Sequence, residues 1–136
     1  MMFAIKAEVS NPSAQILEFS EQKTMYGGKH IAKGDTIFVF ASENEGGRGL
    51  IARAVVVSAE PVAKLTGDER QTPRVTVVLE RTALARRPLG RAELKTFRTW
   101  EDGRPETELN FKLYRQATDK IVGLTDGAAA FLRGFF

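Results

Sequence analysis

The sequence has 136 residues and a formal charge of +3, from 20 basic and 17 acidic side chains, and it contains no cysteine. This length favours one compact domain over residues 1–136, and the lack of cysteine excludes disulfides and thiolate chemistry. With His30 as the single histidine, we expect neither a metal nor a cofactor. No apolar run approaches the roughly 20 residues of a membrane helix, which predicts a soluble, cytoplasmic protein with no membrane partner.

The amino-terminal region combines predicted strands with turns. Residues 3–9 alternate apolar and polar side chains, as a strand does. A short helix is predicted next, capped by Asn11 or Ser13 and ending near Phe19, and its buried side would consist of Ile16, Leu17 and Phe19. Residues 24–30 contain the Gly27-Gly28 pair, which favours an irregular strand or a turn.

The clearest pattern is a turn, Lys33-Gly34-Asp35, that leads into an aromatic and β-branched strand over residues 36–42. A glycine-rich loop over 43–48 and a long apolar strand over 49–60 follow. The polar composition of residues 66–73 predicts an exposed loop. Apolar and polar side chains alternate over residues 74–84, as in a half-buried strand.

The remaining chain favours short helices. They are predicted over residues 91–97 and 108–116, with a turn at 100–105 between them and a strand at 119–124 after them. Thr125 or Asp126 would cap a terminal helix. Five or six strands without regular strand–helix alternation predict an α+β fold, built on a curled sheet or a small barrel.

The order of these features resembles the PUA-like superfamily, with the EVE branch nearest and the ASCH branch second. The resemblance is carried by the strand at residues 3–6, the Gly34-Asp35 turn, the strand ending at Ser42 and the strand that begins Gly49-Leu50-Ile51. It implies a pseudo-barrel of five to six mostly antiparallel strands with short peripheral helices. It also implies a cleft that holds RNA or a modified nucleobase.

A base-binding cleft needs flat side chains for stacking and polar groups that read the base edge. Tyr26, Tyr114 and the single tryptophan, Trp100, are candidate stacking residues, and Trp100 lies in sequence beside Arg98. Trp100 has an equally good structural explanation, as a cover for the edge of the core. We expect Tyr26, Trp100 and Ser42 to line one cleft.

Four further residues are candidates for polar contact with the ligand. Lys29 and His30 follow the glycine pair, where a ligand could approach the backbone closely. The resemblance places Ser42 in the cleft, although Ser42 could equally start the loop that follows. Arg115 is a side chain of the kind that reaches a backbone or a base edge.

Positive charge concentrates between Arg81 and Arg104, where seven basic and three acidic residues give 7 − 3 = +4. This stretch could contact phosphates, which would make binding weaken as salt rises. A solvated charged face is the alternative explanation. The predicted phosphate contacts are Arg86, Arg87, Arg91 and Arg98.

Three functions are compatible with these patterns. The first is a non-catalytic module whose partner is RNA or modified-base nucleic acid. The second is a small hydrolase acting on a nucleoside or a similar amide, with Lys6 or Lys29 as an activated amine and Glu8 as its partner. The third is a protein-interaction domain that uses the carboxyl-terminal Phe131, Phe135 and Phe136, unless Phe135 and Phe136 pack back on the barrel.

Overall fold

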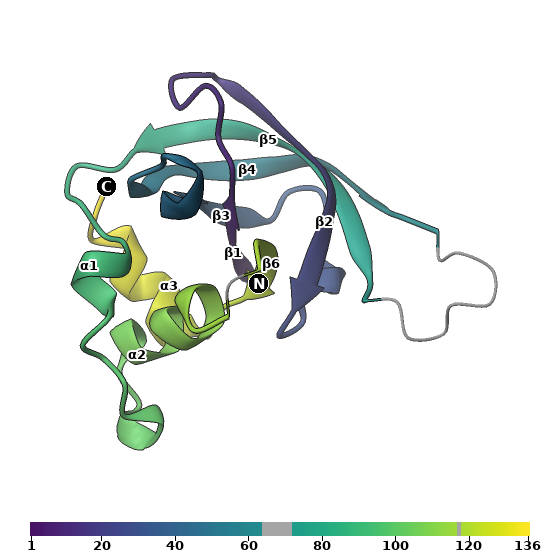
Figure 1. Cartoon of the computed structure of the whole chain (residues 1–136). Helices are drawn as coiled ribbons and strands as arrows, with labels where there is room; N and C mark the ends of the chain where they lie inside the picture. Colours follow the sequence, from purple (N-terminus) through teal and green to yellow (C-terminus); the bar gives the residue numbers. More distant parts are fainter. Residues whose placement is uncertain (64–71, 117) are drawn as a thin grey trace.

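The computed structural model describes residues 1–63, 72–116 and 118–136, and its six strands there form a closed barrel (Figure 1). In chain order the strands are β1 (Met2–Ala7), β2 (Ile16–Met25), β3 (Thr36–Ala41), β4 (Gly49–Pro61), β5 (Arg74–Leu84) and β6 (Lys120–Gly123). Around the barrel the order is β1-β3-β4-β5-β2-β6. The neighbours β1–β3 and β2–β6 run parallel and the other four pairs run antiparallel. The predicted α+β pseudo-barrel is confirmed.

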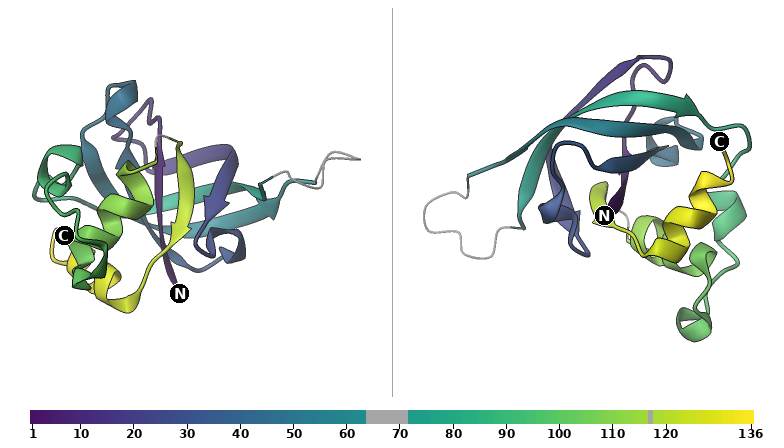
Figure 2. Two further views of the ribbon diagram at one scale, coloured as in Figure 1. Left: turned by 60° about the horizontal axis from the view of Figure 1, so that its bottom comes forward. Right: turned by 180° about the vertical axis from the view of Figure 1, so that it is seen from behind.

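Short helices gather on one side of the barrel (Figure 2). They are α1 (Arg91–Leu94), α2 (Pro105–Leu109) and α3 (Asp126–Arg133), together with the 3-10 turn η3 (Trp100–Asp102) and the π-helical turn η4 (Asn110–Tyr114). Two further 3-10 turns, η1 (Gly28–His30) and η2 (Glu43–Glu45), follow β2 and β3. No helix within the described ranges is long and apolar enough to cross a membrane.

The barrel wall separates two apolar cores. Phe3, Ile5 and Val39 point into the barrel, whereas Ala4 and Phe38 point toward the helices. Because both faces of β1 and β3 are covered, these parallel neighbours are buried along almost their whole length. The side chains at the helix-covered face are therefore held between two packed layers.

The predicted helix from Asn11 or Ser13 to Phe19 is wrong. Strand β2 begins at Ile16, and the buried Leu17 and Phe19 alternate with exposed neighbours. Ile16 itself is 53% exposed, so it is not part of the core. Pairing with β5 from Ile16 to Lys23, interrupted by a bulge, satisfies backbone groups that a short isolated helix would leave without hydrogen bonds.

Other expectations hold at the level of single contacts. Gly34 has a φ of 92°, and Asp35 accepts a hydrogen bond from the Ala32 amide at 2.9 Å, so the predicted turn is confirmed. Phe135 is buried and the Phe136 ring lies 5.9 Å from the Phe38 ring, so both pack back on the barrel. The loop predicted at 66–73 lies mostly outside the described residues.

Strand β6 closes the barrel over a short distance. It pairs with β1 through four residue pairs and with β2 through two, at Thr24 and Met25. Gly28, just after β2, packs directly on the backbone of β6, and a Cβ at Gly28 would collide with the carbonyl oxygen of Ile121. The join between β2 and β6 thus requires glycine at this position.

We expect Gly28→Ala to lower the free energy of unfolding by about 1–3 kcal/mol, because the added methyl group must displace rigid backbone. Gly127→Ala is the matched control, since its Cβ would meet only the Thr125 hydroxyl, at 3.9 Å. That substitution in a helix should leave stability unchanged or raise it by up to about 1 kcal/mol. Urea unfolding of both variants measures the difference, and equal effects would contradict the assigned packing.

Candidate functional site

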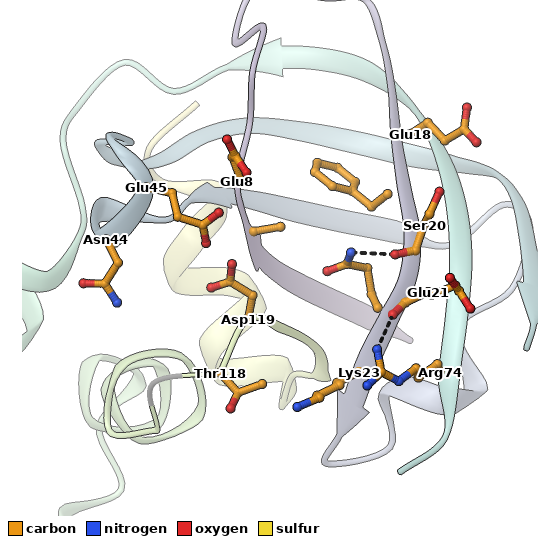
Figure 3. Close-up of a pocket in the computed structure, with 13 residues that line it drawn as sticks. Glu8, Glu18, Ser20, Glu21, Lys23, Asn44, Glu45, Arg74, Thr118 and Asp119 are labelled. Carbon is orange, nitrogen blue, oxygen red and sulfur yellow. Dashed lines mark hydrogen bonds between the residues drawn. The ribbon is translucent and has the colours of Figure 1, made fainter. Parts of the chain in front are cut away.

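A cleft of about 590 Å³ opens between the end of β1 and the first half of β2 (Figure 3). It lies where β6 is too short to connect these two strands, since β6 pairs with β2 only at Thr24 and Met25. Loops after β1 and β3 and the segment before β6 complete its walls. The lining residues are Ala7, Glu8, Glu18, Phe19, Ser20, Glu21, Gln22, Lys23, Asn44, Glu45, Arg74, Thr118 and Asp119.

Three carboxyl groups converge on one side of the cleft, from Glu8, Glu45 and Asp119 (Figure 3). The side chain of Asp119, together with desolvation and the nearby Glu8, raises the pKa of Glu45 to about 7. Near neutral pH the group therefore holds a proton for part of the time. It can offer both a donor and an acceptor to a ligand.

Two buried lysines lie behind this wall. Lys6 Nζ is 4.0 Å from Asp119 Oδ1, and burial lowers the pKa of Lys6. Its register partner on β6, Lys120, is also buried, and burial together with the charge of Lys6 lowers the pKa of Lys120 to about 8. The structure thus pairs Lys6 with Asp119, while Glu8 is exposed at the cleft.

The turn η2, which carries Asn44 and Glu45, is held from behind. The Tyr114 hydroxyl donates to Glu43 at 3.0 Å, and the Arg91 amide donates to the same carboxylate at 2.7 Å. Arg91 Nη2 also donates to Asn44 Oδ1 at 2.9 Å. The predicted ligand residue Tyr114 and the predicted phosphate contact Arg91 thus lie next to the cleft wall, and burial raises the pKa of Tyr114.

Ser42 lies at the start of the same turn. Its amide donates to the Ala7 carbonyl at 2.9 Å, which ties the end of β3 to the end of β1 beside the cleft. The side chain is buried, and within the described residues its Oγ has no hydrogen-bond partner. Ser42 therefore both begins the loop and lies near the cleft wall.

Three predicted residues gather around η4 instead. Lys112 Nζ lies 5.1 Å from the Tyr26 ring and lines a cavity together with Trp100. The Trp100 and Phe111 rings pack edge-on with their centroids 4.7 Å apart, and the Arg115 guanidinium lies 5.1 Å from the centroid of the same Phe111 ring. Trp100 is 59% exposed and Tyr26 43% exposed. We call these five residues the aromatic surface; Ser42 lies apart from it, beside the cleft.

The other predicted residues lie on separate parts of the surface. Lys29 and His30 are exposed on η1, and Arg86 and Arg98 are exposed in the basic stretch. Arg87 is used within the fold, because it donates to the Gly134 carbonyl at 3.0 Å and its guanidinium lies 4.3 Å from the Phe135 ring. In the part of the chain that the structure describes, no group of three or more acidic or histidine side chains is arranged to hold a metal ion.

Sequence reasoning did not single out most of the cleft. Phe19, Lys23, Glu45, Arg74 and Asp119 come from four separate segments of the chain, and only the register of the barrel brings them together. One pattern in the sequence could have indicated the acidic side of the cleft: an acidic residue lies directly next to each of two mainly apolar strands. Glu8 follows β1, and Asp119 precedes β6.

Neither a protein-family model nor a curated protein matches the sequence. Solved structures do match over nearly the whole chain. The DUF55 domain of human thymocyte nuclear protein 1 has a TM-score of 0.67 at 14% identity, covering 98% of this chain and 97% of that one. The human THYN1 protein, in complex with DNA containing 5-methylcytosine, has a TM-score of 0.67 at 16% identity, with coverages of 98% and 95%.

A protein from Pseudomonas putida has a TM-score of 0.65 at 16% identity, covering 99% of both chains. At these identities the likeness concerns the fold. Together with the closed six-stranded barrel, it shows that the chain has the PUA-like pseudo-barrel fold.

We expect Tyr114→Phe to lower the free energy of unfolding by about 1.5–3 kcal/mol, the range for a hydrogen bond to a charged group. The hydroxyl that donates to Glu43 would be lost from a mostly buried position. Tyr26→Phe is the control, because an exposed hydroxyl should change stability by no more than about 0.5 kcal/mol. Urea unfolding tests the pair, and a Tyr114→Phe effect as small as that of the control would disprove the supporting role.

The raised pKa of Glu45 predicts a pH-dependent stability. Folded Glu45 keeps its proton up to about pH 7, whereas the ordinary value is 4.5. Its favourable contribution is therefore complete at acidic pH and is lost as the pH rises through about 7. Relative to Glu45→Gln, which has no charge to acquire, the wild type should lose stability between pH 5 and pH 8. Thermal unfolding at both pH values measures the stability of each protein. A stability difference between wild type and Glu45→Gln that is the same at both pH values would contradict the raised pKa of Glu45.

Proposed function

We propose that this protein is a nucleic-acid-binding module that takes a modified base, of the 5-methylcytosine class, into the cleft between β1 and β2. The observation that carries the proposal is the cleft itself, on a barrel similar over its whole length to one solved with 5-methylcytosine DNA. We place the chain in the EVE branch of the PUA-like superfamily, as the sequence resemblance implies.

The size and the lining of the cleft support a base as the ligand. A volume of about 590 Å³ lies within the range of small-molecule sites. Phe19, an aromatic residue of the barrel core, lines its wall. Enzymes and readers that extrude a base from a duplex hold it by stacking and by hydrogen bonds to its Watson–Crick edge.

The carboxyl groups suit the edge of cytosine. A carboxylate accepts a hydrogen bond from the exocyclic amino group of cytosine. A neighbouring carboxyl group that carries a proton can donate to the adjacent ring nitrogen. Glu45 and Asp119, which lie on the same side of the cleft, offer this combination near neutral pH. The aromatic surface, including Trp100 and Arg115, would contact nucleotides that flank the bound base.

The proposal is tested by fluorescence anisotropy with labelled DNA duplexes that are identical except for one cytosine or 5-methylcytosine, and with RNA of the same sequence. We expect binding that weakens as salt rises, and tighter binding to the methylated duplex. No binding to any probe at low salt would overturn the function. Equal affinity for both duplexes would overturn modified-base recognition alone.

Glu45→Ala should weaken binding to the methylated duplex by about tenfold or more, since a good polar contact to a base is worth about 1–3 kcal/mol. Glu80→Gln is the control, because Glu80 is exposed on β5 away from the cleft lining. The same titrations measure both variants. If the control weakens binding as strongly as Glu45→Ala, the base does not bind at the acidic wall.

A further inference from the structure

The two basic side chains of the cleft lining lie together on one side of it, next to two acidic residues of β2, Glu18 and Glu21. The carboxyl groups of Glu8, Glu45 and Asp119 face one another on one side, and Lys23 and Arg74 lie on the opposite side, on β2 and β5 (Figure 3). In the same view the carboxylates of Glu18 and Glu21 point away from the three converging acids. A ligand with one negative group is repelled from the acidic side and attracted to the basic side. The cleft therefore favours one orientation of a charged ligand.

A bulge in β2 determines where Lys23 lies. Register shifts between Phe19 and Gln22, and Glu21 has a left-handed φ of 50° there. In a regular strand Lys23 would share the inward face of Phe19, because side chains repeat every second residue. The extra residue of the bulge instead places Lys23 directly opposite Arg74.

This arrangement sets two positive side chains side by side. Like charges directly opposite on neighbouring strands destabilise a sheet. Within the described ranges the ion pairs are Lys6–Asp119 and Lys112–Glu108, and neither involves Lys23 or Arg74. Arg74 Nη1 donates to the Glu21 carbonyl at 3.3 Å, which orients the guanidinium without neutralising it. A bound anion would relieve the repulsion.

A second cavity of about 330 Å³ continues from the basic side of the cleft. Lys23 and Thr118 line both cavities, and Thr72, Gln116 and Lys120 contribute to the second. The polar side chains that line this second cavity are two hydroxyls, one amide and two amines, with no carboxylate among the described lining residues. In Figure 3 the Lys23 side chain extends across the opening toward Thr118. Such donor-rich surroundings suit phosphate oxygens.

We propose that Lys23 and Arg74, together with the adjoining cavity, form a phosphate subsite that receives the phosphodiester next to the base. This inference rests on the proposed function and adds the orientation of the bound nucleotide in the cleft. The base edge lies against Glu45 and Asp119, and the phosphate lies against the β2–β5 pair. The phosphate contacts nearest the base thus come from β2 and β5, outside the basic stretch of the sequence.

The test compares wild type with Lys23→Gln, Arg74→Gln and the double variant, using methylated and unmethylated duplexes at several salt concentrations. Each substitution should weaken binding to both duplexes by the same factor, about tenfold for the double variant, and should reduce the salt slope by about 1. Lys33→Gln is the control, because Lys33 is exposed in the turn before β3 and does not line the cleft. Circular dichroism checks that the variants are folded.

A second arm separates a backbone phosphate from a free nucleotide. The nucleoside 5-methyldeoxycytidine and its 5′-monophosphate are titrated separately against wild type and the double variant. If wild type binds the monophosphate more tightly than the nucleoside and the double variant does not, the subsite is supported. If the double variant loses affinity only for the duplexes, the subsite binds the backbone phosphodiester.

If the duplexes still bind with their methylation preference but the variants keep wild-type affinity and salt slope, the subsite is wrong and the proposed function stands. If the variants lose the preference for the methylated duplex, Lys23 and Arg74 contact the base and the proposed orientation is wrong. If wild type binds no nucleic acid, both proposals fall together.

Discussion

The short length of β6 is the constraint on which the rest of the structure depends. A six-stranded barrel must pair every strand on both sides, but β6 spans four residues and meets β2 at two of them. Past that point β1 and β2 separate, and the space between them is the cleft. The short β6 thus leaves a gap in the barrel wall, and this gap is the candidate site. The strand ends and loops around the gap supply its polar side chains.

Keeping such a gap open requires support from outside the barrel. The helices on the outer face bring Tyr114 and Arg91 to Glu43, which holds the turn η2 in place. Beneath the same wall, Lys6 contacts both Asp119 and the Tyr114 ring, at 4.0 Å and 5.1 Å. Buried charges of this kind are costly unless they are paired, so this polar layer fixes the geometry of the wall more than it adds stability.

The parts of the fold that sequence analysis predicted are those defined by local pattern. The Gly34-Asp35 turn, the long apolar strand β4 and the alternation in β5 need only neighbouring residues, and all three are present. The helix expected before Phe19 failed because long-range pairing with β5 decides that segment. The cleft could not be predicted for the same reason. Lys23 and Arg74 become neighbours only through register, and a one-residue bulge decides which face Lys23 occupies.

The basic stretch from Arg81 to Arg104 shows why charge along a sequence is a poor guide to charge on a binding surface. Arg81 donates to the carbonyls of Ser13 and Ala14, and Arg87 and Arg91 hold the carboxyl terminus and η2. The hydrogen bonds of these guanidinium groups hold loops and the carboxyl terminus against the rest of the protein. With a net charge of only +3, the protein has little long-range attraction for nucleic acid. In the proposed complex, affinity would therefore come from a few cations next to the base, and the position of Lys23 and Arg74 at the cleft would matter more than the total charge.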